Sequence, residues 1–364
     1  MKAGICIDGI NSLLENFDSG SKKDRNLKIV KHYLGLDGNG GASMEVAGEP
    51  HGLTRESVRQ ILKKYKEHVQ SSKISFQSIK EVIGILTKLA PVSAVSAASK
   101  LFDSGLIAKD FKIEAILLVA QFFDIPTGEL YAVKEKSFRS QEFTTFIVTL
   151  ETKDLPKSIY SQTLRETSHN GAASVKHISD NNKEGKRNHA SLIKDVVSSI
   201  PGLVWLDDDN NWFYVADQSK NRVLSRLNRI FSVYSKSPLK AASEGIRRSI
   251  NKHNDEISRR LPLHVLAAIC TSEGLHLEND LLHKTHSFSH EIPTSDAEKR
   301  IIASYELKII EAIAVHGKDT IQEVELENII VKEPADKWPY SMALNYSPLI
   351  VRVKRGTYKT TGTY

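Results

Sequence analysis

The stretch 54–66 contains side chains of the kinds that recognise bases in duplex DNA. Arg55, Glu56, Arg59 and Gln60 follow one another at helical spacing. Arginine can donate two hydrogen bonds to O6 and N7 of guanine, glutamine can pair with adenine in the same way, and glutamate can accept from the amino group of cytosine. On the exposed face of a helix that enters the major groove by its N-terminal end, this combination predicts recognition of a DNA sequence.

Two lysines follow one and two turns further along the same predicted helix. Lys63 and Lys66 suit DNA phosphates, which supply affinity but no sequence information. The alternative interpretation is an ordinary amphipathic helix with a solvated charged face. The candidate DNA-binding residues of this segment are Thr54, Arg55, Glu56, Ser57, Arg59, Gln60, Lys63 and Lys66.

The sequence around these residues, 27–69, predicts a helix-turn-helix. Glycine-rich turns over 35–41 and 48–52 separate a first helix, a short helix after Ser43 and a third helix after Thr54. The Thr54 hydroxyl can accept a bond from a free amide in the first turn of that third helix. The apolar residues of the third helix recur at helical spacing and predict one buried face: Val58, Ile61, Leu62, Tyr65 and Val69.

This segment resembles a known family. The string SMEVAGEPHGLTRESVRQIL, 43–62, is similar to region 4 of the primary sigma factors of bacterial RNA polymerase. In that family the matching helix recognises the promoter −35 element, and Arg55, Glu56, Arg59 and Gln60 match the family's base and backbone contacts. The resemblance is limited to about 27–69. No other segment resembles the sigma part that binds the polymerase clamp and melts the −10 element, so we do not expect a complete sigma factor.

Composition and charge are compatible with a nucleic-acid partner. The chain has 364 residues and a formal net charge of +6, and a basic surface attracts polyanions. Cys6 and Cys270 lie far apart in sequence, which argues against a disulfide framework or a cysteine-based zinc site and favours a reducing cytoplasm. The sequence has neither a long apolar run nor a secretory signal pattern, so we expect no membrane partner and a cytoplasmic, nucleoid-associated location.

The C-terminal half repeats one pattern of elements. Three helical segments are followed each time by two short β-like runs around a turn, which is the order of a winged helix. In the last unit the predicted wing contains Arg352, Lys354 and Arg355, and a basic hairpin of this kind commonly follows a phosphate strand or the minor groove. This half is similar to bacterial proteins that join a sigma region 4-like module to further helical domains. It is more weakly similar to winged helices attached to restriction and chromatin proteins.

We therefore expect a mainly α, multi-domain array of a helix-turn-helix and winged helices with short β-hairpin wings. Within the predicted connector, the run FTTFIVTLET favours a strand. The predicted domains are a sigma region 4-like helix-turn-helix over 1–72, a helical bundle over 73–130, a connector over 131–155, and winged helices over 156–218, 219–294 and 295–364.

Residues that could support catalysis occur without the neighbours that catalysis needs. The three aspartates at 207–209 could suggest metal-dependent phosphoryl chemistry, but they fall in a predicted turn. His283, His286 and His290 have a metal-compatible spacing without a fourth ligand. No phosphate-binding loop ending in Gly-Lys-Ser/Thr is present. We expect no enzyme activity, no cofactor and no metal.

Three functions remain open from sequence. The leading hypothesis is a sequence-specific double-stranded DNA-binding protein, acting as a bacterial transcription regulator. The second is a DNA-recognition or sensing subunit of a restriction or phage-defence complex. The third is a scaffold whose winged helices bind proteins. We expect double-stranded DNA as the main partner. RNA polymerase, a defence-complex subunit and a second copy of the chain are the protein partners left open.

Overall fold

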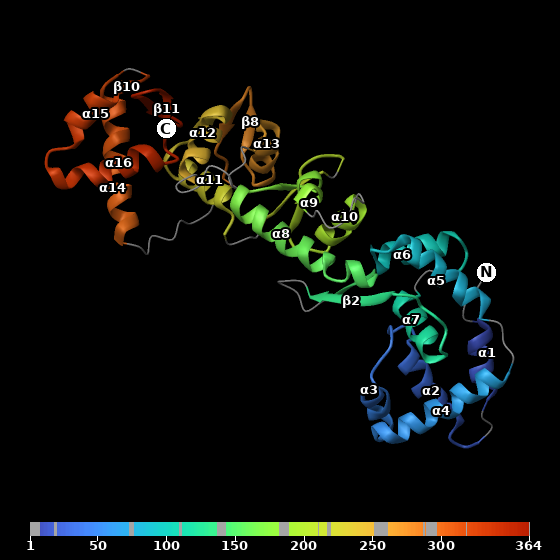
Figure 1. The fold of residues 1–364 in the computed structure, drawn as a ribbon. Coiled ribbons are helices and arrows are strands. Elements are labelled where there is room, and N and C mark those ends of the chain that lie inside the picture. The colour runs from blue at the N-terminus through green and yellow to red at the C-terminus, as the bar shows by residue number, and fades with distance from the viewer. Residues whose placement is uncertain are drawn as a thin grey trace. The chain divides into compact units, whose positions relative to one another are not determined.

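The computed structural model is mainly helical, with small antiparallel sheets (Figure 1). The chain divides into two compact units: Met1–Tyr160 with Gly185–Pro201, and Ser161–Glu184 with Gly202–Tyr364. The division therefore passes through one helix, α8 (Leu155–Asn170). The structure describes residues 8–17, 20–72, 76–108, 111–136, 143–181, 189–209, 211–216, 220–250, 261–286, 288, 297–317 and 319–363.

The first unit begins with a group of short helices whose caps agree with the sequence. The Ser43 hydroxyl accepts from the Val46 amide at 3.3 Å, and the Thr54 hydroxyl accepts from the Ser57 amide at 3.3 Å. Both predicted N-caps are thus confirmed. The elements are α1 (Asp8–Asn16), α2 (Lys23–Leu34), α3 (Met44–Gly48), the 3-10 turn η1 (Glu49–His51) and α4 (Arg55–Ser71).

Helix α4 buries the face that its apolar spacing predicted. Val58, Leu62, Tyr65 and Val69 are buried, whereas Ile61 is half-buried. They pack against buried side chains of α2 and α3, and burial of this face fixes which side of α4 meets solvent. The partners from α2 and α3 are Ile29, Val30, Leu34 and Ala47.

One arrangement of elements then occurs four times among the described residues. Each copy has a helix, a short strand, two helices and two further strands, and its short first strand pairs antiparallel with its last strand. The first copy consists of α5 (Gln77–Leu89), β1 (Val92–Ser93), α6 (Ala94–Asp103), α7 (Ile113–Phe122), β2 (Tyr131–Lys136) and β3 (Phe143–Val148). The second consists of α8, β4 (Ala173–Ser174), α9 (Val175–Asn181), α10 (Ala190–Ser198), β5 (Leu203–Trp205) and β6 (Trp212–Val215).

The last two copies lie in the second unit. The third consists of α11 (Arg222–Val233), β7 (Lys236–Pro238), α12 (Leu239–Ile250), α13 (Leu263–Ser272), β8 (His276–Glu278) and β9 (Leu281–His283). The fourth consists of α14 (Ala297–Val315), β10 (Ile321–Gln322), α15 (Glu323–Ile330), α16 (Lys337–Tyr346), β11 (Ile350–Lys354) and β12 (Thr357–Thr360).

The first copy differs from the sequence expectation. We predicted a helical bundle over 73–130 and a separate connector over 131–155, but β1 pairs with β3 through Val92 and Ile147. The two predicted segments therefore share one sheet. The strand expected in FTTFIVTLET is present as β3. Strand β1 has only two residues, which is too short to show the period-2 pattern that would have revealed it.

The third and fourth copies are joined by main-chain contacts. The chain end adds a strand-like bridge to β7, where Lys236 and Thr363 exchange backbone hydrogen bonds of 2.8 and 3.1 Å. The Tyr234 hydroxyl donates to the Leu349 carbonyl at 3.0 Å. The Arg248 guanidinium, from α12, donates to three carbonyls of the fourth copy: Leu344 at 2.9 Å, Ile350 at 3.2 Å and Asn345 at 3.3 Å.

Candidate nucleic-acid interface

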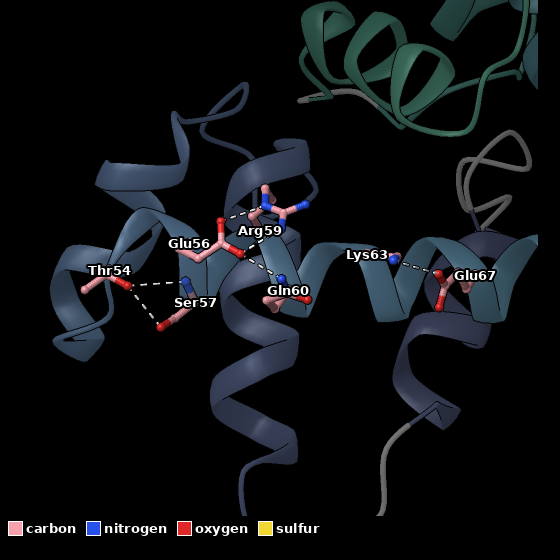
Figure 2. A network of polar contacts seen from close by, with 7 residues as sticks. All are labelled: Thr54, Glu56, Ser57, Arg59, Gln60, Lys63 and Glu67. Atoms are coloured by element: carbon pink, nitrogen blue, oxygen red, sulfur yellow. Dashed lines mark hydrogen bonds and ion pairs between the residues drawn. The ribbon is translucent and has the colours of Figure 1, made fainter.

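The N-terminal turn of α4 is fixed by its cap. Thr54 Oγ1 lies 3.3 Å from the Ser57 amide nitrogen and 3.0 Å from the Ser57 hydroxyl (Figure 2). Both hydroxyls are therefore engaged with each other. Because the cap satisfies an amide that has no partner within the helix, the first turn is ordered before any ligand arrives.

Glu56 organises the two residues that follow it on the same face. Its carboxylate accepts from Arg59 Nε and Nη2, each at 2.7 Å, and from Gln60 Nε2, also at 2.7 Å (Figure 2). These hydrogen bonds lower the pKa of Glu56 to about 2, and the bonds from Arg59 have the largest effect on it. The same pairing raises the pKa of Arg59. Glu56 is thus ionised at any ordinary assay pH, and both of its oxygens are occupied.

Each partner of Glu56 keeps hydrogen-bonding capacity for a ligand. Arg59 retains its Nη1 group and one proton on Nη2, and Gln60 retains its Oε1 acceptor and one amide proton. Both side chains are exposed. The remaining groups are a set of donors on Arg59 and a donor–acceptor pair on Gln60, which match the edges of guanine and adenine in the major groove.

Arg55 and Lys63, two further exposed cations of α4, lie in weak ion pairs. Arg55 Nε is 3.2 Å from Glu45 Oε1, and Lys63 Nζ is 3.8 Å from Glu67 Oε1 (Figure 2 shows the second pair). All four side chains are more than half exposed. Exposed pairs of this kind contribute about 0–1 kcal/mol, so a DNA phosphate can replace the carboxylate at little cost.

Lys66 is placed differently from Lys63. Its ammonium lies 2.7 Å from Asp124 Oδ2 and 5.8 Å from the centre of the Phe122 ring, and the side chain is 29% exposed. Gln70 donates to the same carboxylate at 3.2 Å. Lys66 therefore links α4 to the end of α7. Asp124 is 58 positions away in sequence, so helical spacing gave no signal for this partner.

The third helix of each repeated copy lacks an equivalent set of exposed side chains. Helix α7 is mostly buried beside the helix-turn-helix segment, and α10 is held to β1 by a hydrogen bond of 2.8 Å from Ser93 to Asp195. Helix α13 contains neither lysine nor arginine. Helix α16 has one lysine, Lys337, which lies 3.7 Å from Glu327, and it exposes Trp338. Among the described third helices, only α4 presents arginine and glutamine together.

The predicted basic wing is a short hairpin in the second unit. Strands β11 and β12 pair antiparallel, with Lys354 opposite Thr357. Arg352, Lys354 and Arg355 are all exposed at this end of the hairpin. Their ammonium and guanidinium groups are suited to phosphate contacts.

Asp207, one of the three aspartates considered for metal-dependent chemistry, takes part in a turn. Asp207 Oδ1 accepts from the amides of Asn211 at 2.7 Å and Trp212 at 3.0 Å, which is a turn interaction. Burial raises the pKa of the Cys270 thiol to about 12. Within the part of the chain that the structure describes, no three His, Cys, Asp or Glu side chains gather into a metal site, and His290 lies outside that part.

No family model matches the chain, and neither a curated protein nor a solved structure matches it. None of the helices among the described residues combines the length and apolar character needed to cross a membrane.

Proposed function

We propose that this chain is a sequence-specific double-stranded DNA-binding protein, acting as a bacterial transcription regulator, and that α4 is its recognition helix. The observation that supports this most directly is the first turn of α4. There, Glu56 holds Arg59 and Gln60 in a fixed, exposed arrangement on a helix whose opposite face is buried. Preorganised side chains lose less conformational freedom on binding, which favours affinity for a complementary surface.

In this proposal the residues of α4 have distinct roles. Arg59 donates to a guanine edge, and Gln60 pairs with an adjacent adenine. Glu56 positions both of them and does not itself accept from cytosine. Arg55 and Lys63 exchange their exposed carboxylate partners for phosphates. Lys66 supports α4 from within the first unit.

We further infer that the four repeated copies are winged helices. The order of helices and strands and the pairing of the first strand with the last support this assignment. The burial of α7 and the Ser93–Asp195 contact of α10 favour a structural or protein-binding role for the first two copies over base recognition. The exposed cations Arg352, Lys354 and Arg355 favour a phosphate contact for the wing of the fourth copy.

Selection of bound duplexes from a random pool, followed by a gel shift, tests the proposal. We expect a preferred sequence that binds below micromolar concentration at about 50 mM salt. Arg59→Ala should weaken binding to that sequence by about 1–3 kcal/mol and relax the preference at one base pair. Lys88→Ala, an exposed lysine on α5, is the matched control and should change neither.

Two results would contradict the proposal. Failure of every duplex to bind below micromolar concentration removes DNA binding itself. A loss in Arg59→Ala that is uniform over all sequences reduces Arg59 to a phosphate contact. Chromatin profiling then separates the roles, because promoter peaks are expected for a regulator and binding to invading DNA for a defence subunit.

A further inference from the structure

Helices α8 and α11 bring a row of basic side chains together in the second unit. Two hydrogen bonds join the end of α8 to the start of α11: Asn221 Nδ2 donates to the Gly171 carbonyl at 2.9 Å, and the Ser168 hydroxyl donates to the Lys220 carbonyl at 3.1 Å. The basic residues on the two sides of this junction, which we call the basic row, are Arg165 and His169 of α8 and Arg222, Arg226 and Arg229 of α11.

The members of the basic row lie close to one another. Residues three or four positions apart are neighbours on the surface of a helix. Arg165 and His169 have this spacing on α8, and Arg222, Arg226 and Arg229 have it on α11. Electrostatic effects connect the two helices, because burial lowers the pKa of His169 and both Arg222 and Arg165 lower it further. The row is therefore continuous from α8 to α11.

Two carboxylates lie near the basic row, and each has another partner. Glu306 of α14 is 7% exposed and accepts a hydrogen bond from Arg229. Glu166 accepts from the Asn170 amide at 2.7 Å, and its effect on the pKa of His169 is the weakest of those acting there. The four arginines of the row thus outnumber the carboxylates beside it among the described residues.

The outer part of the basic row is accessible. Arg165 and Arg222 are exposed, whereas His169, Arg226 and Arg229 are half-buried. Arg222 is the first residue of α11, where the helix has a partial positive charge that disfavours an arginine and favours an anion. Like charges one turn apart also lower stability. A bound polyanion would offset both costs.

The composition of this surface favours the backbone of duplex DNA over other polyanions. Small molecules are usually held in concave pockets, whereas Arg165 and Arg222 are exposed. Single-stranded nucleic acids are bound by stacking on aromatic side chains, but the only Phe, Tyr or Trp within 161–170 and 222–233 is Phe231, which is buried. Serine and asparagine are common phosphate contacts, and Ser225 and Asn228 lie among the arginines of α11.

We propose that the basic row is a further DNA-binding surface of this chain, which contacts the phosphate backbone of duplex DNA through Arg165 and Arg222. The inference rests on the proposed function, because its ligand is the same duplex DNA. Its role differs from that of α4, since phosphate contacts add affinity for every sequence and confer no preference. Arg226 and Arg229 lie deeper and add positive potential behind the contact.

Binding of the full chain to a duplex of unrelated sequence, measured by fluorescence anisotropy over a range of salt concentrations, tests the proposal. Arg165→Gln combined with Arg222→Gln should reduce the slope of log affinity against log salt by about 1.8, the value for two phosphates, and should weaken binding at least about tenfold at about 50 mM salt. Lys80→Gln combined with Lys88→Gln removes two exposed lysines of α5 and is the matched control, which should leave the slope unchanged.

Arg165→Lys combined with Arg222→Lys keeps both charges and should keep the slope. If the glutamine pair does not fold, as judged by circular dichroism, each single glutamine substitution should reduce the slope by about 0.9. An unchanged slope in folded glutamine variants, an equal loss in the α5 control, or a reduced slope in a folded lysine pair would overturn the proposal. A loss confined to single-stranded DNA would overturn it as well.

The same measurement distinguishes failure of the basic row from failure of recognition by α4. Binding to unrelated duplexes with the expected slopes, but without any preferred sequence, contradicts recognition by α4 and supports the basic row. A preferred sequence with an unchanged slope in the glutamine pair contradicts the basic row alone. Absence of binding to every duplex contradicts both proposals.

Discussion

At the scale of single residues, Glu56 determines what the face of α4 can offer to DNA. Its two oxygens accept three hydrogen bonds from Arg59 and Gln60. The sequence predicted these three residues as independent base contacts. Their geometry makes them one unit, in which the carboxylate orients the other two side chains. Substitutions within such a unit are not expected to be additive.

Glu56→Ala should therefore change specificity more than affinity. Arg59 and Gln60 lose their common acceptor, so we expect weaker discrimination at the base pairs they contact and stronger binding to unrelated duplexes, because one negative charge has gone. Selection from a random pool measures both. Glu67→Ala, which removes the partner of Lys63, is the control and should increase non-specific binding without changing the preferred sequence.

The lowered pKa of Glu56 gives this prediction a pH dependence. A carboxyl whose pKa is lowered in the folded state contributes its pairing above its ordinary pKa and loses it only as the pH falls toward about 2. The preferred sequence should thus be the same at pH 5 and pH 8. A preference that changes between these values would show that another group orients Arg59 and Gln60.

Lys63 and Lys66 should behave differently although both were predicted to contact phosphates. Lys63 is 63% exposed beside an exposed glutamate, whereas Lys66 is bound to Asp124 at 2.7 Å. Lys63→Ala should reduce the slope of log affinity against log salt by about 0.9, the value for one phosphate. Lys66→Ala should leave the slope unchanged and lower thermal stability slightly. A reduced slope for Lys66→Ala would show that DNA displaces Asp124.

At the scale of elements, the turn after α2 sets where α3 and α4 begin. Gly35 has φ +72° and ends α2, and an added Cβ would lie 2.5 Å from the Gly41 nitrogen and 2.7 Å from the Gly40 carbonyl carbon. Gly38 has φ +89° with open space around it. The two positions share the strained backbone conformation but differ in crowding.

Alanine at these two glycines separates strain from crowding. Gly38→Ala should destabilise the first unit by about 1–2 kcal/mol through its positive φ alone. Gly35→Ala should cost about 1–3 kcal/mol more, because main-chain atoms must shift. Hydrogen exchange of peptides from α2 and α4 measures the two costs. Equal protection in both variants would contradict the close approach of Gly35 to 40–41.

At the scale of the whole molecule, contacts between repeated copies join the third copy to the fourth. Arg248 satisfies three main-chain carbonyls of the fourth copy from a helix of the third, and its guanidinium lies 5.7 Å from the Tyr358 ring. Burial lowers the pKa of Arg248. The last two copies therefore share a polar contact as well as a core.

Arg248→Met should destabilise the second unit by about 2–4 kcal/mol, because three carbonyls lose their donor. Its neighbour Arg247 pairs with Glu244 one turn away and is 40% exposed, so Arg247→Met should cost less than about 1 kcal/mol. All three tryptophans, Trp205, Trp212 and Trp338, lie in the second unit, and their fluorescence during urea unfolding reports on it. Similar costs for the two variants would contradict the role of Arg248.

Local patterns in the sequence determined much of the first unit. The spacing of Val58, Leu62 and Tyr65 predicted the buried face of α4. Ser43 predicted the N-cap of α3, and Thr54 predicted the N-cap of α4. Both kinds of feature depend on residues within one or two turns. The exposed positions of Arg55, Arg59 and Gln60 follow from the same spacing. The strand in FTTFIVTLET was predicted from its β-branched and aromatic residues.

Only the tertiary structure decided which partners these residues have. Asp124 approaches Lys66, Ile147 pairs with Val92, and Arg248 reaches the fourth copy, all from positions far away in sequence. Helical or strand periodicity contains no information about such contacts, since they depend on how separate elements pack. Packing also decided that the third helices α7 and α10 are occupied inside the first unit, while α4 keeps its charged face in solvent.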